Sequence, residues 1–168
     1  ILDNTNERLE SIGIAVPGVV SNGTIEKCVN LGIKDYKIAD KLNERFIEYA
    51  SNNGKHWQFN DLPVIIKLQN DAKCAAIAEN KYGILKDYEN SIFLTLGTGI
   101  GGAVIVDGKL LEGKYFSGYE LGHMTIDING EQCKCGKKGC FELYGSMKSF
   151  KRRFKEKTFG SVVTIDDY

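Results

Sequence analysis

The chain has 168 residues, of which 42% are hydrophobic and 26% charged, a composition typical of a folded globular protein rather than a disordered one. Lys plus Arg and Asp plus Glu both number 22, so composition gives no electrostatic case for a nucleic-acid or membrane-surface partner. No apolar run approaches the roughly 18–20 residues that a membrane span needs, and no stretch resembles a secretion signal. Three cysteines crowd into eight positions, which favours metal binding in a reducing compartment, so we predict a cytoplasmic protein.

The hydrophobic pattern predicts strands that alternate with helices and hairpins, which defines an α/β fold class. The predicted strands cover residues 11–16, 19–20, 24–29, 63–69, 91–96 and 103–106. The predicted helices are 36–50, 72–81 and a third one that carries Leu143, Met147, Phe150 and Phe154 on one face. A domain joint is expected between Asp71 and Asn90, because the chain restarts there with a new hairpin.

One histidine and three cysteines form the strongest motif. His123 precedes Cys133, Cys135 and Cys140, a Cys₃His set of the kind that holds structural zinc in tetrahedral geometry. The Cys-x-Cys pair places two thiolates on one tight turn, and the glycines that follow allow Cys140 to reach the same ion. Because all four positions are filled by protein, the motif predicts a structural zinc site rather than a catalytic one. The alternative is three ordinary thiols beside a surface histidine.

A glycine-rich segment, 97–102, follows the predicted strand 91–96 and contains the pattern G-x-G-x-x-G. A dinucleotide-binding loop of this pattern opens a helix, whereas this one leads into strand, so we reject that interpretation. No Lys-Ser/Thr follows, so it is not a Walker A loop either. What remains is a strand–loop–strand turn whose amides and Thr98 hydroxyl could cradle phosphate oxygens, or a hairpin without a ligand.

Asn70-Asp71 lies where a predicted strand ends and a helix begins. Asn and Asp favour helix N-termini, so capping alone accounts for the pair when it is considered in isolation.

Five motifs occur in one order: Val16-Pro17-Gly18, Asn70-Asp71-Ala72, Leu96-Gly97-Thr98-Gly99-Ile100-Gly101-Gly102, Glu120-Leu121-Gly122-His123 and Cys133-x-Cys135-Gly136-x-x-Gly139-Cys140-x-Glu142. This series closely resembles the ROK family, named for its repressors, open reading frames and sugar kinases. The resemblance runs from about Ile12 to Gly145.

The resemblance implies an actin-like ATPase fold of two ribonuclease H-like lobes, with a hexose and ATP bound between them. Asp71 would be the catalytic base, and Thr98 and Gly99 would face the ATP phosphates, which Mg²⁺ neutralises. His123 would serve twice, ligating zinc with one ring nitrogen and contacting sugar with the other. The residues implied to hydrogen-bond the sugar are Asn30, Asn70, Glu120, His123 and Glu142. Zinc is expected to hold the last three in place, as outer-shell partners do at other metal sites.

The match also has limits. Residues 1–75 are expected to form part of the smaller N-terminal lobe, and residues 76–168 the first part of the larger lobe with the zinc site. The family's other phosphate-binding loop, Asp-x-Gly-Gly-Thr, is missing ahead of Pro17, and family members continue well past residue 168. The fold is therefore expected to be incomplete at both ends, and the isolated chain to turn over poorly or not at all. The resemblance also suggests a homodimer.

Two functions of different classes follow from the resemblance. The first is an ATP-dependent, glucokinase-like sugar kinase, favoured because Asp71 and an intact glycine-rich segment are retained. The second is the sugar-sensing domain of a ROK-type transcriptional repressor, which would bind nucleic acid only through an upstream helix-turn-helix. A catalytically inactive sugar-binding protein is a third alternative. Glucose is the default sugar, with fructose, mannose and N-acetylmannosamine as alternatives.

Overall fold

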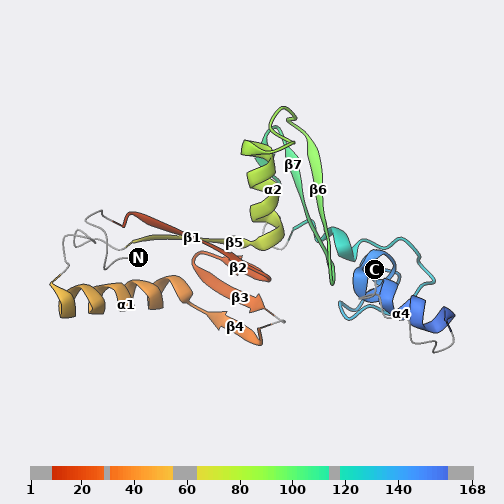
Figure 1. Ribbon diagram of the computed structural model, residues 1–168, viewed down its shortest axis with the longest axis horizontal. Helices are drawn as coiled ribbons and strands as arrows, with labels where there is room; N and C mark the ends of the chain where they lie inside the picture. The colour runs from red at the N-terminus through yellow and green to blue at the C-terminus, as the bar shows by residue number, and fades with distance from the viewer. Residues whose placement is uncertain (1–8, 29–30, 55–63, 114–117, 159–168) are drawn as a thin grey trace. The chain divides into compact units, whose positions relative to one another are not determined.

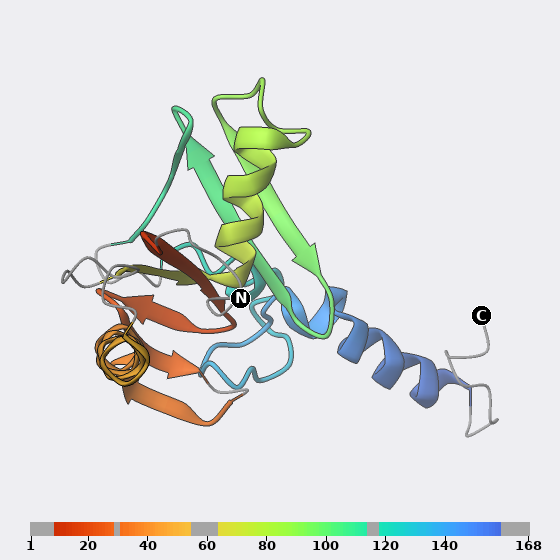
Figure 2. The ribbon, with the colours of Figure 1, turned by 60° about the vertical axis from the view of Figure 1, so that its left-hand side comes forward.

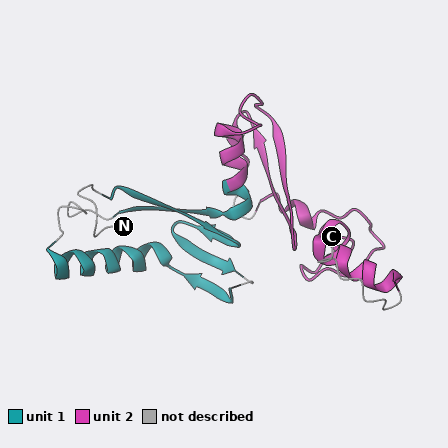
Figure 3. Cartoon of the chain, viewed as in Figure 1, with its two compact units in different colours: residues 1–74, 115–117 teal, residues 75–114, 118–168 magenta. Residues whose placement is uncertain are grey.

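The computed structural model describes residues 9–28, 31–54, 64–113 and 118–158, and it divides the chain into two compact units (Figure 3). Unit 1 comprises residues 1–74 and 115–117, and unit 2 comprises residues 75–114 and 118–168. Each unit contains strands and helices, which confirms the α/β class. The assignment of the two units to the smaller and larger lobes stays a prediction.

Unit 1 contains one parallel strand pair, one antiparallel sheet and one long helix. The parallel pair is β1 (Ser11–Val16) with β5 (Ile65–Asn70), and the antiparallel sheet has the order β2 (Val19–Ser21), β3 (Thr24–Cys28), β4 (Ile33–Tyr36). Helix α1 (Ile38–Asn53) lies beside these strands in Figure 1.

Apolar side chains hold unit 1 together in two clusters. In the first, Val16, Val20, Ile25 and Cys28 are buried together, with partly buried Leu68 of β5 against them. Cys28 is fully buried and donates from Sγ to the Pro17 carbonyl oxygen at 3.3 Å. In the second cluster, apolar side chains of α1 pack on the β1–β5 pair and the residues next to it. The members of this cluster are Ala50, Val64, Leu9, Ile12, Phe46, Tyr49 and Ile66.

Pairing of β1 with β5 brings two motifs to one edge of the sheet. Parallel strands end at the same edge, and the register sets Val16 opposite Asn70. The Asn70 Nδ2 group donates to the Gly18 carbonyl oxygen at 3.3 Å, although 52 residues separate the two in sequence. Val16-Pro17-Gly18 and Asn70-Asp71 are therefore neighbours in space.

Unit 2 begins within helix α2 (Asp71–Tyr82), whose first four residues belong to unit 1. The antiparallel sheet of β6 (Ser91–Leu96), β7 (Ile100–Val106) and β8 (Lys109–Leu110) follows. Figures 1 and 2 both show α2 alongside the β6–β7 hairpin. Buried Ala76 of α2 packs there against Ala103 and Ile105 of β7. The rest of the unit carries η3 (Leu121–His123), α3 (Glu142–Gly145) and α4 (Met147–Lys157).

Three predicted elements differ from the structure. The first predicted helix, 36–50, begins later, because Tyr36 ends strand β4 and pairs with Ile25. The predicted loop 97–102 is shorter, because Gly101 and Gly102 belong to β7 and pair with β6. The predicted C-terminal helix is broken at Ser146, whose backbone is extended (ψ 156°) and whose Oγ caps α4 by accepting from the Ser149 N–H.

Within the described ranges, none of the helices combines the length and the apolar character that crossing a bilayer requires.

Removing the Ile105 side chain should destabilise unit 2. Ile105 is only 2% exposed and packs against Ala76 and Ala103, so Ile105→Ala should lower the free energy of unfolding by about 3 kcal/mol. The next residue, Val106, is 38% exposed, and Val106→Ala should change it by less than about 1 kcal/mol. Urea unfolding measures both variants, and equal losses would contradict this core.

Candidate functional site

The four predicted zinc ligands lie together in unit 2. One ligand atom from each of His123, Cys133, Cys135 and Cys140 lies within 4.8 Å of all the others. The Cys135 and Cys140 sulfurs are 3.5 Å apart, and the Cys133 Sγ atom is 3.7 Å from His123 Nδ1. Cys140 is fully buried and Cys133 is 4% exposed, whereas Cys135 is exposed. We call these four residues the cysteine cluster.

A short hairpin delivers two of the cysteines. Gln132 and Lys138 form an antiparallel bridge, and within it the Cys133 N–H donates to the Lys137 carbonyl oxygen at 2.7 Å. The Cys133–Cys135 segment is thereby bent into a tight turn. Because of this turn, the sulfurs of Cys133 and Cys135 can both reach the same metal ion.

The other two ligands come from segments that pair with each other. His123 ends η3, and Thr125 forms an antiparallel bridge with Cys140. The Cys140 Sγ atom consequently lies 3.6 Å from the His123 carbonyl oxygen. Since His123 Nδ1 faces the thiols, Nε2 is the ring nitrogen that remains for a second partner.

The pKa values of the Cys140 and Cys135 thiols shift in opposite directions. Burial raises the pKa of Cys140 to about 12, and the adjacent Cys135 and Cys133 sulfurs add to this effect. The pKa of Cys135 is lowered, chiefly by the backbone N–H of Lys137. A coordinated thiol is deprotonated outright, so a bound cation would overcome the effect of burial at Cys140.

The donor set fits a tetrahedral zinc ion. Zinc–sulfur bonds of about 2.3 Å at tetrahedral angles place two ligand sulfurs about 3.8 Å apart. The observed separation of 3.5 Å between the Cys135 and Cys140 sulfurs is close to that value. Three sulfurs and one imidazole also match the softness that zinc prefers.

Gly139 is required by the geometry of the cluster. Its φ is +63°, and a Cβ atom there would overlap the Asp127 carbonyl oxygen. Gly139→Ala should therefore displace the neighbouring Cys140 and lower zinc affinity at least about tenfold, in line with the loss of a support around a metal site. Competition with a chromogenic chelator measures this affinity. Gly108→Ala, also at positive φ (+68°) but with open space around it, is the matched control and should keep wild-type affinity.

The glycine turn, which we define as residues 97–99 between β6 and β7, contains both predicted phosphate contacts. Gly97 N–H donates to the Gly99 carbonyl oxygen at 3.0 Å. Within the described part of the chain, the N–H groups of Thr98 and Gly99 have no hydrogen-bond partner, and Thr98 is exposed. Because the turn leads into a strand, it is not a dinucleotide-binding loop. Free amides on an exposed turn are suited to bind phosphate oxygens.

Asn70 and Asp71 occupy the end of β5 and the start of α2 in unit 1. The Asn70 Oδ1 atom accepts from the Lys73 N–H at 3.2 Å, so Asn70 does cap the helix. Asp71 is exposed, and its Oδ1 atom accepts from the Ala72 N–H at 2.9 Å. Behind it, Ala72 and Lys73 are buried. Asp71 is therefore an exposed carboxylate on a fixed helix turn.

The remaining predicted sugar contacts are distributed differently. Glu120 is exposed and immediately precedes η3, whereas Glu142 is partly buried and begins α3. Asn30 lies outside the described residues. Because Asn70 and Asp71 belong to unit 1, and Glu120 and Glu142 to unit 2, their meeting around one ligand stays a prediction.

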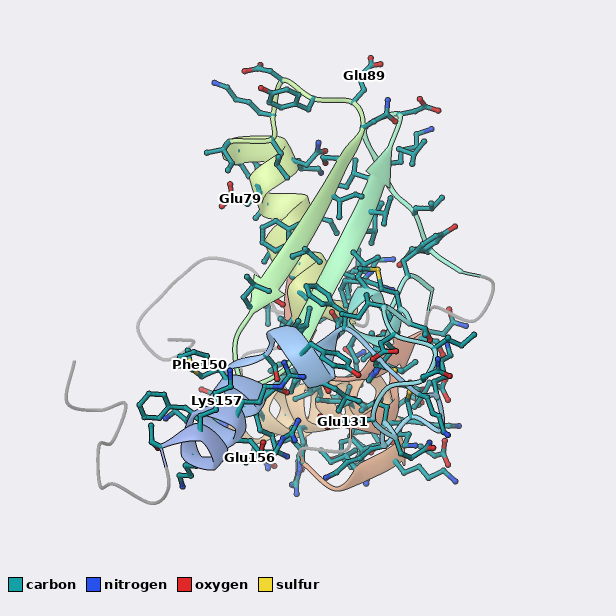
Figure 4. All side chains as sticks on the ribbon, turned by 90° about the vertical axis from the view of Figure 1, so that its right-hand side faces the viewer. Glu79, Glu89, Glu131, Phe150, Glu156 and Lys157 are labelled. Carbon is teal, nitrogen blue, oxygen red and sulfur yellow. The ribbon has the colours of Figure 1, made fainter. Side chains whose placement is uncertain are left out.

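Sequence reasoning missed the groups that support the cluster from α4. The Arg152 guanidinium binds both carboxylate oxygens of Glu131, at 2.9 and 2.7 Å, and this contact raises the pKa of Arg152. Arg153 lies over the Tyr144 ring, 4.7 Å from its centroid. Figure 4 shows Glu131 beside the helix that carries Glu156. The available signal was an acidic residue just ahead of the cysteines and arginines on the following helix.

Comparison with known proteins gives a consistent family assignment. Residues 1–162 match the ROK family model. The chain is 35% identical over 162 residues to the xylose repressor of Bacillus subtilis (strain 168), covering 94% of this chain and 38% of that protein. It is 35% identical over 147 residues to the glucokinase of Halalkalibacterium halodurans, covering 86% of this chain and 40% of that enzyme.

The fold is similar to that of a ROK family glucokinase from Streptomyces griseus, solved in complex with glucose and AMPPNP. The TM-score is 0.69 at 28% identity, over 90% of this chain and 44% of the other. The chain therefore belongs to the ROK family and has the actin-like ATPase fold of ROK sugar kinases, as the motif series predicted. It spans about two fifths of the length of these relatives.

Proposed function

We propose that the protein containing this chain is an ATP-dependent hexose kinase, with Asp71 as general base. The observation that carries the proposal is the exposed Asp71 carboxylate at the carboxyl edge of a parallel strand pair, on a helix start fixed by Asn70. The similarity to glucokinases supports the kinase class.

The chemistry suits the groups present. Phosphoryl transfer passes through a loose transition state, so positioning and electrostatic stabilisation supply most of the catalysis. Asp71 would orient the sugar hydroxyl and accept its proton as the hydroxyl attacks the γ-phosphate. The Thr98 and Gly99 amides would hold phosphate oxygens, and Mg²⁺ would neutralise their charge.

The cysteine cluster would position the sugar contacts rather than take part in the chemistry. His123 would use Nδ1 for zinc and Nε2 for the sugar, as the position of its ring beside Cys133 supports. Glu120 lies one residue ahead of η3, and Glu142 two residues after Cys140. Zinc would thus fix the segments that carry all three groups.

A glucose substrate is supported by the names of the relatives. Both the Halalkalibacterium enzyme and the Streptomyces structure are called glucokinases, and the latter was solved with glucose bound. We propose glucose as the first substrate to test, with fructose, mannose and N-acetylmannosamine as alternatives. A homodimer and a cytoplasmic location stay predictions.

A second function is supported by a separate observation. The xylose repressor of Bacillus subtilis is as similar to this chain as the glucokinase is. In a sugar-sensing repressor the sugar contacts would be needed, but Asp71 and the free amides of the glycine turn would have no task. Their presence favours the kinase.

Measurement of sugar-dependent ADP release by the protein that contains this chain, with a panel of hexoses and xylose, tests the two functions. A kinase releases ADP with at least one hexose. Binding of a sugar without ADP release, together with sugar-dependent binding to DNA, would reject the kinase in favour of the repressor.

A further inference from the structure

The carboxylate of Glu142 is already engaged in this structure, and its partner is the glycine turn. Glu142 Oε2 accepts a hydrogen bond from the Ile100 N–H at 2.9 Å. The same oxygen lies so close to Gly99 that an added Cβ atom there would be 2.5 Å from it. The carboxylate therefore closes the end of the turn next to β7.

The other end of the turn is held by the same part of the chain. The Met147 N–H, at the start of α4, donates to the Gly97 carbonyl oxygen at 2.9 Å. Residues of α3 and α4 thus bind both ends of the turn. Between these two ties lie the free amides of Thr98 and Gly99, the groups proposed to bind phosphate.

Glu142 is itself firmly placed. Ser149 Oγ donates to the Glu142 carbonyl oxygen at 2.9 Å, and Ser146 Oγ donates to Ser149 Oγ at 3.0 Å. Both serines are buried, at 2% and 6% exposure. A carboxylate on such a support can hold an amide at fixed distance, and a hydrogen bond to a charged acceptor is among the stronger ones in proteins.

Two of the segments joined by the cysteine cluster contact Ile100, namely those that carry Cys140 and His123. Glu142 follows Cys140 by two residues and binds the Ile100 N–H. Gly122 precedes His123 and is packed so tightly that a Cβ atom on it would overlap the Ile100 carbonyl oxygen. The residue that ends the glycine turn is thus held on both sides by neighbours of cluster ligands.

We propose that Glu142 is a positioning residue for the phosphate turn, and that it couples the state of the cysteine cluster to nucleotide binding. Through the Ile100 N–H it sets the conformation in which the Thr98 and Gly99 amides are presented. Metal in the cluster then favours nucleotide binding as well as sugar binding. The coupling to nucleotide rests on the proposed kinase function, whereas the bond from Glu142 to Ile100 does not.

The test uses the protein that contains this chain, without sugar, so that a sugar contact of Glu142 plays no part. Glu142→Ala removes the acceptor, and Glu142→Gln retains an oxygen that can accept from the Ile100 N–H. Glu48→Ala is the matched control, because it removes an exposed carboxylate that binds Arg45 within α1 and contacts neither the turn nor the cysteine cluster. Each protein is studied zinc-loaded and after chelation.

Two measurements test the bond from Glu142 to Ile100 separately from nucleotide binding. Hydrogen exchange of the Ile100 amide, followed by NMR, reports the hydrogen bond itself. Titration with Mg–ADP reports the phosphate turn. Glu142→Ala should abolish Ile100 protection and weaken Mg–ADP binding about tenfold, as expected for the loss of a hydrogen bond to a charged group. Glu48→Ala should keep both close to wild type, and Glu142→Gln, which retains a neutral acceptor, should lose clearly less than Glu142→Ala.

Chelation of zinc tests whether the cysteine cluster is coupled to nucleotide binding through Glu142. In the wild type, removal of zinc should lower Ile100 protection and weaken Mg–ADP binding about tenfold. In Glu142→Ala the further loss should be smaller than in the wild type, because only the Gly122 contact with Ile100 remains to be released. Wild-type protection of Ile100 in Glu142→Ala, or an unchanged effect of chelation in that variant, would overturn the proposal. A loss in Glu142→Gln equal to that in Glu142→Ala would also overturn it. If neither the wild type nor any variant binds Mg–ADP, the kinase proposal and the coupling to nucleotide binding are both rejected. Hydrogen exchange of Ile100 then still decides whether the bond from Glu142 to the Ile100 N–H exists.

Discussion

In the proposed kinase, Asp71→Asn should lower the kcat of sugar phosphorylation by about 10²- to 10⁴-fold, the usual contribution of a general base. The amide cannot accept the hydroxyl proton, so the step that the carboxylate assists loses its acceptor. Sugar affinity should change little, because the Asn oxygen can still accept from the Ala72 N–H and keep the side chain in place. ADP release at saturating sugar measures kcat, and calorimetric sugar titration measures the affinity.

Asp40→Asn is the control for this change. Asp40 is also an exposed carboxylate in the first turn of a helix, α1, but it belongs to none of the family motifs. It should retain wild-type kcat. Substantial activity in Asp71→Asn would remove Asp71 from the role of base, and a loss confined to sugar affinity would make it a binding residue instead.

Loss of the metal should have the largest effect on stability. Structural zinc sites contribute on the order of 10 kcal/mol in zinc-finger peptides. None of the apolar core clusters among the described residues includes a residue of 121–141, so the cysteine cluster would be the main support of this segment. A strong chelator, or Cys140→Ser, should therefore remove bound zinc and unfold this segment. Since protons compete with metal for thiolates, zinc affinity should also fall as the pH is lowered.

Metal content and thermal unfolding with and without chelator measure the effect. Cys74→Ser is the matched control, because Cys74 is a half-buried thiol outside the cluster whose pKa is raised by burial and by the charge of Asp71. It should keep a full equivalent of zinc and its sensitivity to chelation. A wild-type protein that is purified without zinc and melts identically in chelator would contradict the metal site.

Local patterns account for much of the fold. Ser11–Val16 and Ser91–Leu96 were predictable because short apolar runs bounded by glycine or proline favour strands, although one face of each strand is exposed in the structure. Strand β4 was not, because Ile33–Tyr36 is short and mostly exposed and lacks an apolar alternation. Its existence depends on pairing with β3, which local sequence does not encode.

The candidate site likewise contains features that local sequence predicts and features that depend on contacts between distant residues. The cysteine cluster was predictable from spacing, since zinc geometry limits which residue types and turns can supply four ligands. The break at Ser146 was missed because the apolar spacing of Leu143, Met147 and Phe150 continues across it. The hydrogen bond from the Ile100 N–H to Glu142 joins residues 42 positions apart, and no sequence pattern within either segment predicts it.

The pairing of β1 with β5 has a consequence for how the proposed activity would arise during folding. The contact from Asn70 to Gly18 closes a span of 52 residues, and contacts of such separation form slowly because the loop must lose its entropy first. The carboxylate proposed to act as base stands one residue beyond that contact. Catalytic competence should therefore emerge late in refolding, after the helices have formed. Recovery of activity would report whether β1 and β5 have paired in their native register.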